Sequence, residues 1–178
     1  MPTGEREMLF GKTVIRPATS DDADSLVKLG ERLAKTDPFL VVSGFDPVTG
    51  ASLIQSAIKD GARTQSSRIF VAANEAELAG LAICRRHPAP ERDSIVQLDL
   101  GVDEKYRRRG FGNTLVHQAI DWARTTGAHR VQLAVVADNA AAISLYQKHG
   151  FEIEGTLRQG FRLESRFYDV HVMARLLI

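Results

Sequence analysis

Hydrophobic residues follow two patterns along the chain, and together these patterns predict a sheet flanked by helices. Short runs rich in Val, Ile, Leu and Phe are typical of β-strands. They lie at residues 13–16, 69–73, 78–85, 95–102, 131–135, 151–157 and 167–177. In the run at 131–135, Val131, Leu133 and Val135 alternate with less hydrophobic neighbours, which is typical of a half-buried strand.

Four segments between these runs carry hydrophobic residues at helical spacing. Three of them start at a residue suited to a helix N-terminus: Ser20, Asp46 and Asn139. The other follows a Gly-x-Gly turn and carries Phe111, Leu115 and Val116 on its apolar face. Because helices separate some strands and hairpins separate others, we expect one mixed α/β sheet of about seven strands with about four helices. Residues 1–11 are expected to be an N-terminal extension, and residues 12–178 a single domain.

The composition narrows the possible partners. Of the 178 residues, 44% are hydrophobic and 25% are charged, which is ordinary for a globular domain. The net charge of +1 gives no general attraction to nucleic acid or to an anionic membrane. No segment approaches the roughly 20 apolar residues that span a bilayer. The single cysteine, Cys84, cannot form an internal disulfide. We therefore expect a cytoplasmic protein without nucleic-acid or membrane partners.

The most distinctive segment follows the predicted strand at 95–102. Three arginines and a Gly-x-Gly turn lead from it into the third helix: Arg107, Arg108, Arg109, Gly110, Phe111 and Gly112. Glycine brings backbone N–H groups close to a ligand, and the first N–H groups of a helix have no intrahelical partner. This pattern favours a bound phosphate or pyrophosphate. The alternatives are an ordinary loop with solvated arginines and a contact with RNA phosphates, against which the small net charge argues.

A second informative segment is the short helix between Asn139 and Gly150. Asn139 suits the N-cap, and Tyr146 lies seven residues later, about two turns along the same face. Taken alone, Tyr146 fits a half-buried packing residue. Its position about 30 residues after the glycine turn also fits a functional role.

In this order, the two segments resemble the signature of the GNAT superfamily of acetyl-CoA-dependent N-acetyltransferases. Its first half, Gln/Arg-x-x-Gly-x-Gly/Ala, is matched by Arg107, Gly110 and Gly112. Its second half, an asparagine cap followed by Leu-Tyr-x-x-x-Gly-Phe, is matched by Asn139, Leu145, Tyr146, Gly150 and Phe151. The resemblance spans residues 13–177, and the last two strands are similar to those of bacterial members that acetylate free amino acids or other small amines.

The resemblance implies a sheet that is splayed in the middle, where the strand at 95–102 diverges from its neighbour at 131–136. The pantetheine arm of acetyl-CoA would lie in this gap, and its diphosphate would lie on the N–H groups of residues 108–112. A backbone N–H near Val102 would stabilise the thioester oxygen, and Tyr146 would protonate the departing thiolate. The residues expected to bind acetyl-CoA are Leu100, Gly101, Val102, Arg107, Arg108, Arg109, Gly110, Phe111, Gly112, Asn113, Asn139 and Tyr146.

The general base of the family has no match in this chain. Ribosomal-protein N-terminal acetyltransferases of the superfamily carry a glutamate where this chain has Ala134, and other members carry one where Gln97 falls. Asp99, on the same strand face as Gln97, is the nearest remaining carboxylate and our candidate base. The alternatives are that Asp99 is a surface or interface residue and that a water chain serves as the base.

We expect the acceptor to be a primary amine of a small molecule or amino acid, which attacks directly in a ternary complex. Phe39 and Phe45 are candidate substrate-binding residues, because the matching region of the family borders the acceptor site; ordinary packing is the alternative. A protein N-terminus or lysine is the rival acceptor, and a non-catalytic acyl-CoA-binding sensor is the rival class. The family suggests a homodimer. No metal is expected, since the five histidines lack spacing such as His-x-x-x-His.

Overall fold

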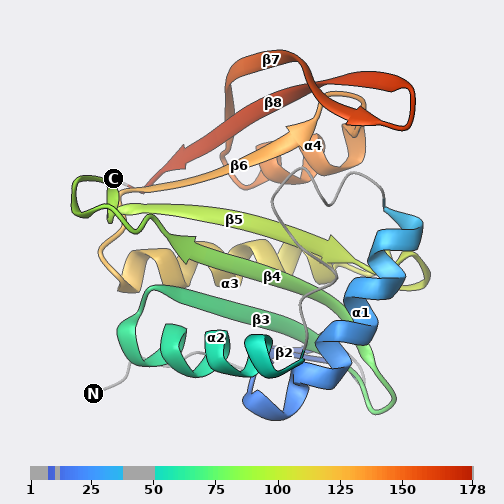
Figure 1. Ribbon diagram of the computed structural model, residues 1–178, viewed down its shortest axis with the longest axis vertical. Coiled ribbons are helices and arrows are strands. Elements are labelled where there is room, and N and C mark those ends of the chain that lie inside the picture. Colours follow the sequence, from blue (N-terminus) through green and yellow to red (C-terminus); the bar gives the residue numbers. More distant parts are fainter. Residues whose placement is uncertain (1–7, 11–12, 38–50, 178) are drawn as a thin grey trace.

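The computed structural model describes residues 8–10, 13–37 and 51–177, and it contains one mixed sheet with helices on both faces (Figure 1). Within these residues the sheet has eight strands in the order β1-β2-β3-β4-β5-β6-β8-β7. The strands are β1 (Met8–Phe10), β2 (Thr13–Pro17), β3 (Ser67–Ala73), β4 (Leu78–Arg86), β5 (Ile95–Val102), β6 (Arg130–Val136), β7 (Glu152–Leu163) and β8 (Arg166–Leu176). Of the neighbouring pairs, β5 and β6 run parallel and the others antiparallel.

The four predicted helices are present in the described part of the chain. They are α1 (Ala23–Thr36), α2 (Ala51–Thr64), α3 (Phe111–Thr125) and α4 (Ala140–Lys148), with short 3-10 helices η1 (Ser20–Asp22), η3 (Pro90–Arg92) and η4 (Glu104–Tyr106). The seven predicted strands are also present. The short β1, which pairs Leu9 with Val14, adds an eighth strand from within the segment expected to be an extension. The predicted helix start at Asp46 lies outside the described residues.

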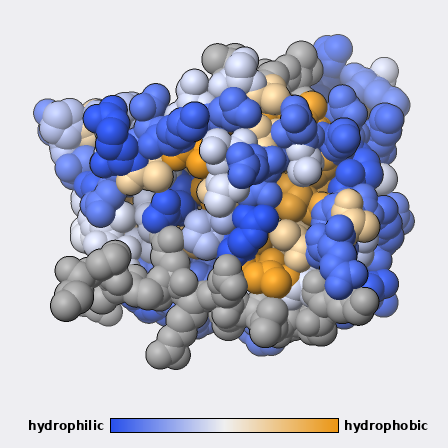
Figure 2. Space-filling model, turned by 90° about the horizontal axis from the view of Figure 1, so that it is seen from below, coloured by the Kyte–Doolittle hydropathy of each residue, from blue (hydrophilic) through white to orange (hydrophobic). Residues whose placement is uncertain are grey.

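Each face of the sheet has its own hydrophobic core. Leu115 and Val116 of α3 pack with Val96 of β5 in one core, and Leu29 of α1 packs with Leu81 of β4 in the other. In Figure 1, α3 lies behind the sheet, and α1 and α2 lie in front of it. The side at which α2 and β2 lie is mostly hydrophilic, with apolar residues in small areas between the polar ones (Figure 2). This distribution follows from amphipathic helices that bury one face.

Alternation along β5 directs its side chains to the two faces in turn. Val96 and Leu98 lie in the core beneath α3. Asp99 pairs across the sheet with Ile83, which packs against the core of α1. Asp99 therefore lies on the face that α1 and α2 cover.

The pairing between β5 and β6 is confined to the beginning of both strands. The paired residues are Ile95 with Arg130, Val96 with Val131 and Gln97 with Gln132. Beyond them, β5 continues to Val102 beside β4, and β6 continues to Val136 beside β8. The two strands move apart along their length (Figure 1), so the predicted splay in the middle of the sheet is confirmed.

Candidate active site

The turn before α3 presents backbone N–H groups near the open end of β5. Gly110, the N-cap of α3, has a φ of 88°, and the exposed Arg108 has a φ of 60°. Glycine adopts this left-handed conformation at little cost, whereas arginine does so less readily. The N–H of Thr114 donates to the Gly110 carbonyl at 3.2 Å. The N–H groups of residues 111–113 precede this bond at the positive end of the helix dipole, where an anion is stabilised.

Gly112 lies where α3, α4 and β5 meet. A Cβ at this position would lie 3.2 Å from Leu145 Cδ2, 3.8 Å from Val102 Cγ2 and 3.9 Å from Leu100 Cδ2. The absence of a side chain at Gly112 therefore lets the first turn of α3 approach α4 closely. The sequence pattern found this glycine, and the structure adds helix packing as a reason for it.

Arg107 and Arg109 make different contacts. The Nε of Arg107 donates to the Val102 carbonyl at 3.1 Å, and its Nη2 donates to Asp37 Oδ2 at 3.2 Å. The guanidinium of Arg109 lies over the ring of Tyr106, 5.4 Å from the ring centroid. Arg107 is therefore turned toward β5 and the end of α1, and Arg109 is stacked against η4.

Tyr146 is buried on α4, with 6% of its surface exposed. Its ring packs against Phe151 with the ring centroids 5.8 Å apart. Burial raises the pKa of the phenol above its ordinary value of 10.0, and the charges of Asp99 and Asp37 raise it further. The phenol therefore stays protonated at neutral pH, as a proton donor must.

Asp99 is buried, with 1% of its surface exposed, and the Nη2 of Arg85 on β4 donates to its Oδ2. The interpretation of Asp99 as a surface residue is therefore wrong. The polar face formed by Gln97 and Asp99 suggested solvent, but α1 and α2 lie over this face of the sheet, and Arg85 supplies the counter-charge. The charge of Asp99 contributes to the raised pKa of Tyr146, and both residues belong to elements that border the open end of the β5–β6 pair.

The two positions that carry glutamate in other members lie in the centre of the sheet. Gln97 accepts a hydrogen bond of 3.3 Å from Gln132 Nε2, and Gln132 Oε1 accepts one of 3.1 Å from Arg130 Nε. Arg130 in turn forms an ion pair with Glu154 on β7. This polar chain links β5, β6 and β7 where the gap begins. Ala134 lies further along β6, beyond the last residue paired with β5.

The other residues expected to bind acetyl-CoA lie around the same end of β5. Leu100 and Val102 pack against the core beneath α3, as does Phe111 at the start of that helix. Gly101 lies close to β4, since a Cβ on Gly80 would be 2.9 Å from its carbonyl oxygen.

The two expected asparagines hold helix ends. Asn139 Oδ1 accepts a hydrogen bond of 3.2 Å from the N–H of Ala142, so it caps α4 as predicted. Asn113 Oδ1 lies 3.1 Å from His149 Nε2 and joins the first turn of α3 to the end of α4.

Sequence patterns did not single out two charged residues of this region, Asp37 and Arg85. Asp37 is joined to Arg107, which lies 70 positions later in the chain, and Arg85 is joined to Asp99 across two strands. No local motif marks either residue, because each depends on tertiary contacts. The predicted substrate-binding residues Phe39 and Phe45 lie outside the described residues.

Comparison with known proteins decides the family. The model of the acetyltransferase (GNAT) family matches residues 39–151. The chain belongs to the GNAT acetyltransferase family. It is therefore an acyltransferase, and its family uses acetyl-CoA, so the resemblance inferred from the two sequence segments is confirmed.

Relatives of this GNAT protein act on different acceptors. L-amino acid N-acetyltransferase AaaT of Escherichia coli K12 is 31% identical over 111 residues, which cover 60% of this chain and 67% of that protein. Ribosomal protein bS18-alanine N-acetyltransferase of Salmonella typhimurium is 39% identical over 86 residues, which cover 48% and 57%. The crystal structure of a GNAT acetyltransferase from Streptococcus pneumoniae matches with a TM-score of 0.86 and 29% identity, covering 93% of this chain and 99% of that one.

Three further findings concern other kinds of site. Among residues 8–10, 13–37 and 51–177, no three His, Cys, Asp or Glu side chains form a group that could hold a metal ion. No helix in the described part of the chain is long and apolar enough to cross a membrane. Cys84 is buried, and burial together with the charge of Asp99 raises the pKa of its thiol, as expected for a structural cysteine.

Proposed function

We propose that the protein transfers the acetyl group of acetyl-CoA to a primary amine of a small molecule or amino acid, by direct attack in a ternary complex. The observation that carries this proposal is the meeting of three features at one place. They are the part of β5 that has left β6, the N-terminus of α3, and α4 with the buried phenol of Tyr146. A Cβ on Gly112 in α3 would lie within 4 Å of side chains of both β5 and α4.

The residues present suit acetyl-CoA. The segment 98–102 of β5 pairs with β4 on one side only, so its backbone groups toward β6 are available to an amide-bearing arm. The N–H groups of residues 111–113 would hold the diphosphate. Gly112 keeps α3 and α4 close enough to form one wall along both the amide-bearing arm and the diphosphate. The bound thioester supplies the acetyl group.

The reaction requires two proton transfers, one from the acceptor amine and one to the departing thiolate. An alkyl ammonium has a pKa near 10, so the acceptor must lose a proton before it attacks. We keep Asp99 as the candidate base for this step; because its side chain has no exposed surface, the proton would reach it through water. As the new N–C bond forms and the C–S bond breaks, Tyr146 donates its proton to the leaving thiolate. A backbone N–H near Val102 would stabilise the oxygen that becomes negative.

A protein N-terminus is the rival acceptor, and the relative that acetylates ribosomal protein bS18 favours it. Ala134, where such enzymes carry a glutamate, argues for a small amine instead, as does the relative that acetylates L-amino acids. A cytoplasmic location and a homodimer complete the proposal.

The test measures release of CoA thiol from acetyl-CoA with separate pools of amino acids, polyamines and alanine-initiated peptides. We expect thiol release above the acceptor-free control with amino acids or small amines. Release with peptides alone would move the assignment to a protein acceptor. Binding of acetyl-CoA with no turnover on any amine would favour the sensor, and no binding at millimolar concentration would reject both.

A further inference from the structure

The end of α1 is joined to the turn before α3 by an ion pair. Asp37 follows α1 directly, and its N–H donates to the Leu33 carbonyl at 2.7 Å. Its Oδ2 lies 3.2 Å from Arg107 Nη2, and the same guanidinium donates to the Val102 carbonyl. Arg107 therefore links the last residue of β5 to the C-terminal end of α1, which lies beside it in Figure 1.

A second link about one turn earlier on α1 keeps this helix end in place. Arg32 Nε donates to Asp103 Oδ2 at 2.6 Å, and its Nη2 donates to the Leu78 carbonyl at 2.7 Å. Asp103 is buried, so its carboxylate in this ion pair is largely shielded from water, whereas Arg32 is partly exposed. The carboxylate of Asp37 is therefore held both by its ion pair with Arg107 and by α1, which Arg32 fixes to Asp103.

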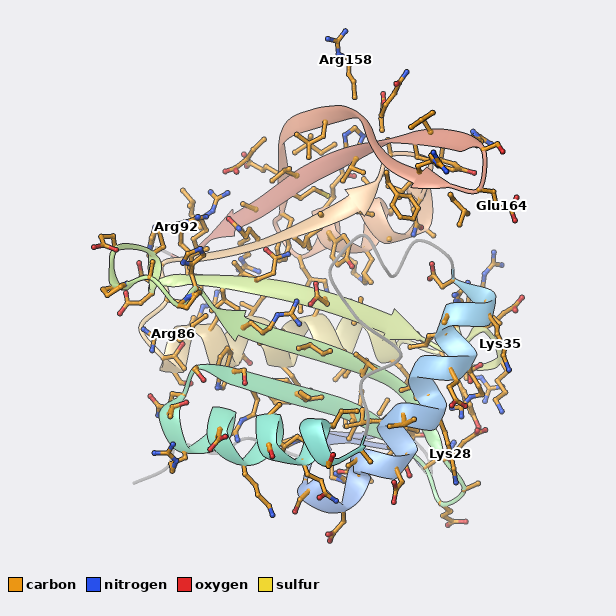
Figure 3. The ribbon with its side chains drawn as sticks, viewed as in Figure 1. Lys28, Lys35, Arg86, Arg92, Arg158 and Glu164 are labelled. Carbon is orange, nitrogen blue, oxygen red and sulfur yellow. The ribbon has the colours of Figure 1, made fainter. Side chains whose placement is uncertain are left out.

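Through Arg107, Asp37 lies at the open end of β5, where Val102 and Leu145 of α4 both surround Gly112. The charges of Asp37 and Asp99 both raise the pKa of Tyr146, the residue after Leu145. The two carboxylates differ in access: the side chain of Asp99 has no exposed surface, whereas that of Asp37 is 23% exposed. Lys35 of α1 and Arg158 of the β7–β8 hairpin project outward into solvent (Figure 3). Asp37 is thus a partly exposed carboxylate at the open end of β5 that a dissolved amine can reach.

We propose that Asp37 binds the ammonium group of the acceptor and places it beside Tyr146, with Arg107 holding Asp37 in position. This inference rests on the proposed N-acetyltransferase function. Alkyl amines are protonated at neutral pH, so the acceptor arrives as a cation. A fixed carboxylate binds such an ammonium group strongly, because the hydrogen bond between them is charge-assisted. Asp37 thereby selects amines over neutral hydroxyl compounds.

The test uses the full chain, with the amine that gives the fastest CoA release. In Asp37→Asn, the acceptor KM should rise about tenfold or more, because a neutral amide replaces the charged partner. The Kd of acetyl-CoA, measured by calorimetry, should change by less than about twofold. Asp37→Glu keeps the charge and should restore part of the acceptor KM. Asp121→Asn is the matched control, since Asp121 Oδ1 also lies 3.2 Å from an arginine, Arg124, but on the surface of α3.

The outcomes separate this inference from the proposed function. An unchanged acceptor KM in Asp37→Asn, or a weaker Kd for acetyl-CoA with the acceptor KM unchanged, overturns the role of Asp37. A wild-type chain that binds acetyl-CoA but acetylates no amine overturns the proposed function, and this inference with it, before any variant is made.

Discussion

The two halves of the β5–β6 pair differ in what their strands contact. In the first half, residues 95–97 pair with residues 130–132, and the side chains of Gln97 and Gln132 bridge the strands. In the second half, β5 keeps β4 as a neighbour but has left β6, and the charge of Asp99 on this part of β5 raises the pKa of Tyr146. A ligand can bind where a strand has stopped pairing with its neighbour. Changes in the open half should therefore affect catalysis, and changes in the paired half should affect mainly stability.

The largest effect is expected in the open half, from Tyr146→Phe. This change removes the phenol hydroxyl but keeps the ring on Phe151. We expect kcat to fall by about 10²- to 10⁴-fold, the usual contribution of a positioned acid. The Kd of acetyl-CoA, measured by calorimetry, should stay nearly unchanged because the packing remains.

The pH dependence gives a second measurement on the same residue. Burial and the charges of Asp99 and Asp37 hold the pKa of Tyr146 above 10.0. A proton donor with a raised pKa loses its proton only as the pH rises through that higher value. Wild-type kcat should therefore show no loss from this group below about pH 10.

The matched control for Tyr146→Phe is Tyr168→Phe, on β8 with its ring 6.4 Å from that of Phe161, and this variant should keep the wild-type rate. Full activity in Tyr146→Phe would remove Tyr146 from the mechanism.

A smaller effect is expected where the open half meets α3, from Gly112→Val. The new Cβ would lie 3.2 Å from Leu145 Cδ2 and would push the first turn of α3 away from α4. Calorimetry should show a loss of about tenfold or more in acetyl-CoA affinity, since the N–H groups of residues 111–113 would be displaced. The free energy of unfolding should fall by about 1–3 kcal/mol.

Gly155→Val is the control for this change. A Cβ on Gly155 in β7 meets nothing within 4 Å, and valine suits an exposed strand. Both affinity and stability should therefore be retained. If Gly112→Val bound acetyl-CoA as tightly as the wild type, the start of α3 would not be the anion site.

The sequence predicted the features that depend on local pattern. The strand expected at 95–102 has those bounds in the structure, α3 follows directly from the glycine turn as expected, and Asn139 caps α4. Each follows from a short run of residues: hydrophobic alternation, a glycine turn or a capping side chain. The order of the two motifs then indicated the family.

Features that depend on tertiary contact were missed. The burial of Asp99 requires α1 and α2 over the sheet and Arg85 on the neighbouring strand, neither of which has a signal near residue 99. The place of Asp37 depends on a turn 70 residues later in the chain. Sequence reasoning could therefore find the residues of the turn and of α4, but not the electrostatic environment that makes one carboxylate buried and the other accessible.

The smallest effect is expected in the paired half, from Gln97→Leu. This change removes the hydrogen bond of 3.3 Å with Gln132 at the last paired position of β5 and β6. The free energy of unfolding, measured by denaturant titration, should fall by about 0.5–1.5 kcal/mol. The value of kcat/KM should change by less than about twofold, because backbone pairing already fixes where the strands part.

A double-mutant cycle with Gln132→Leu separates the bond from its surroundings. The two changes should couple by about 0.5–1 kcal/mol in stability and not at all in kcat/KM. The cycle is needed because Gln132→Leu also removes the hydrogen bond that Gln132 accepts from Arg130, whereas Gln97→Leu leaves that bond in place. A fall of more than about tenfold in kcat/KM of Gln97→Leu, with stability retained, would contradict the comparison. The side chain of Gln97 would then act on the acceptor although its backbone is paired with β6.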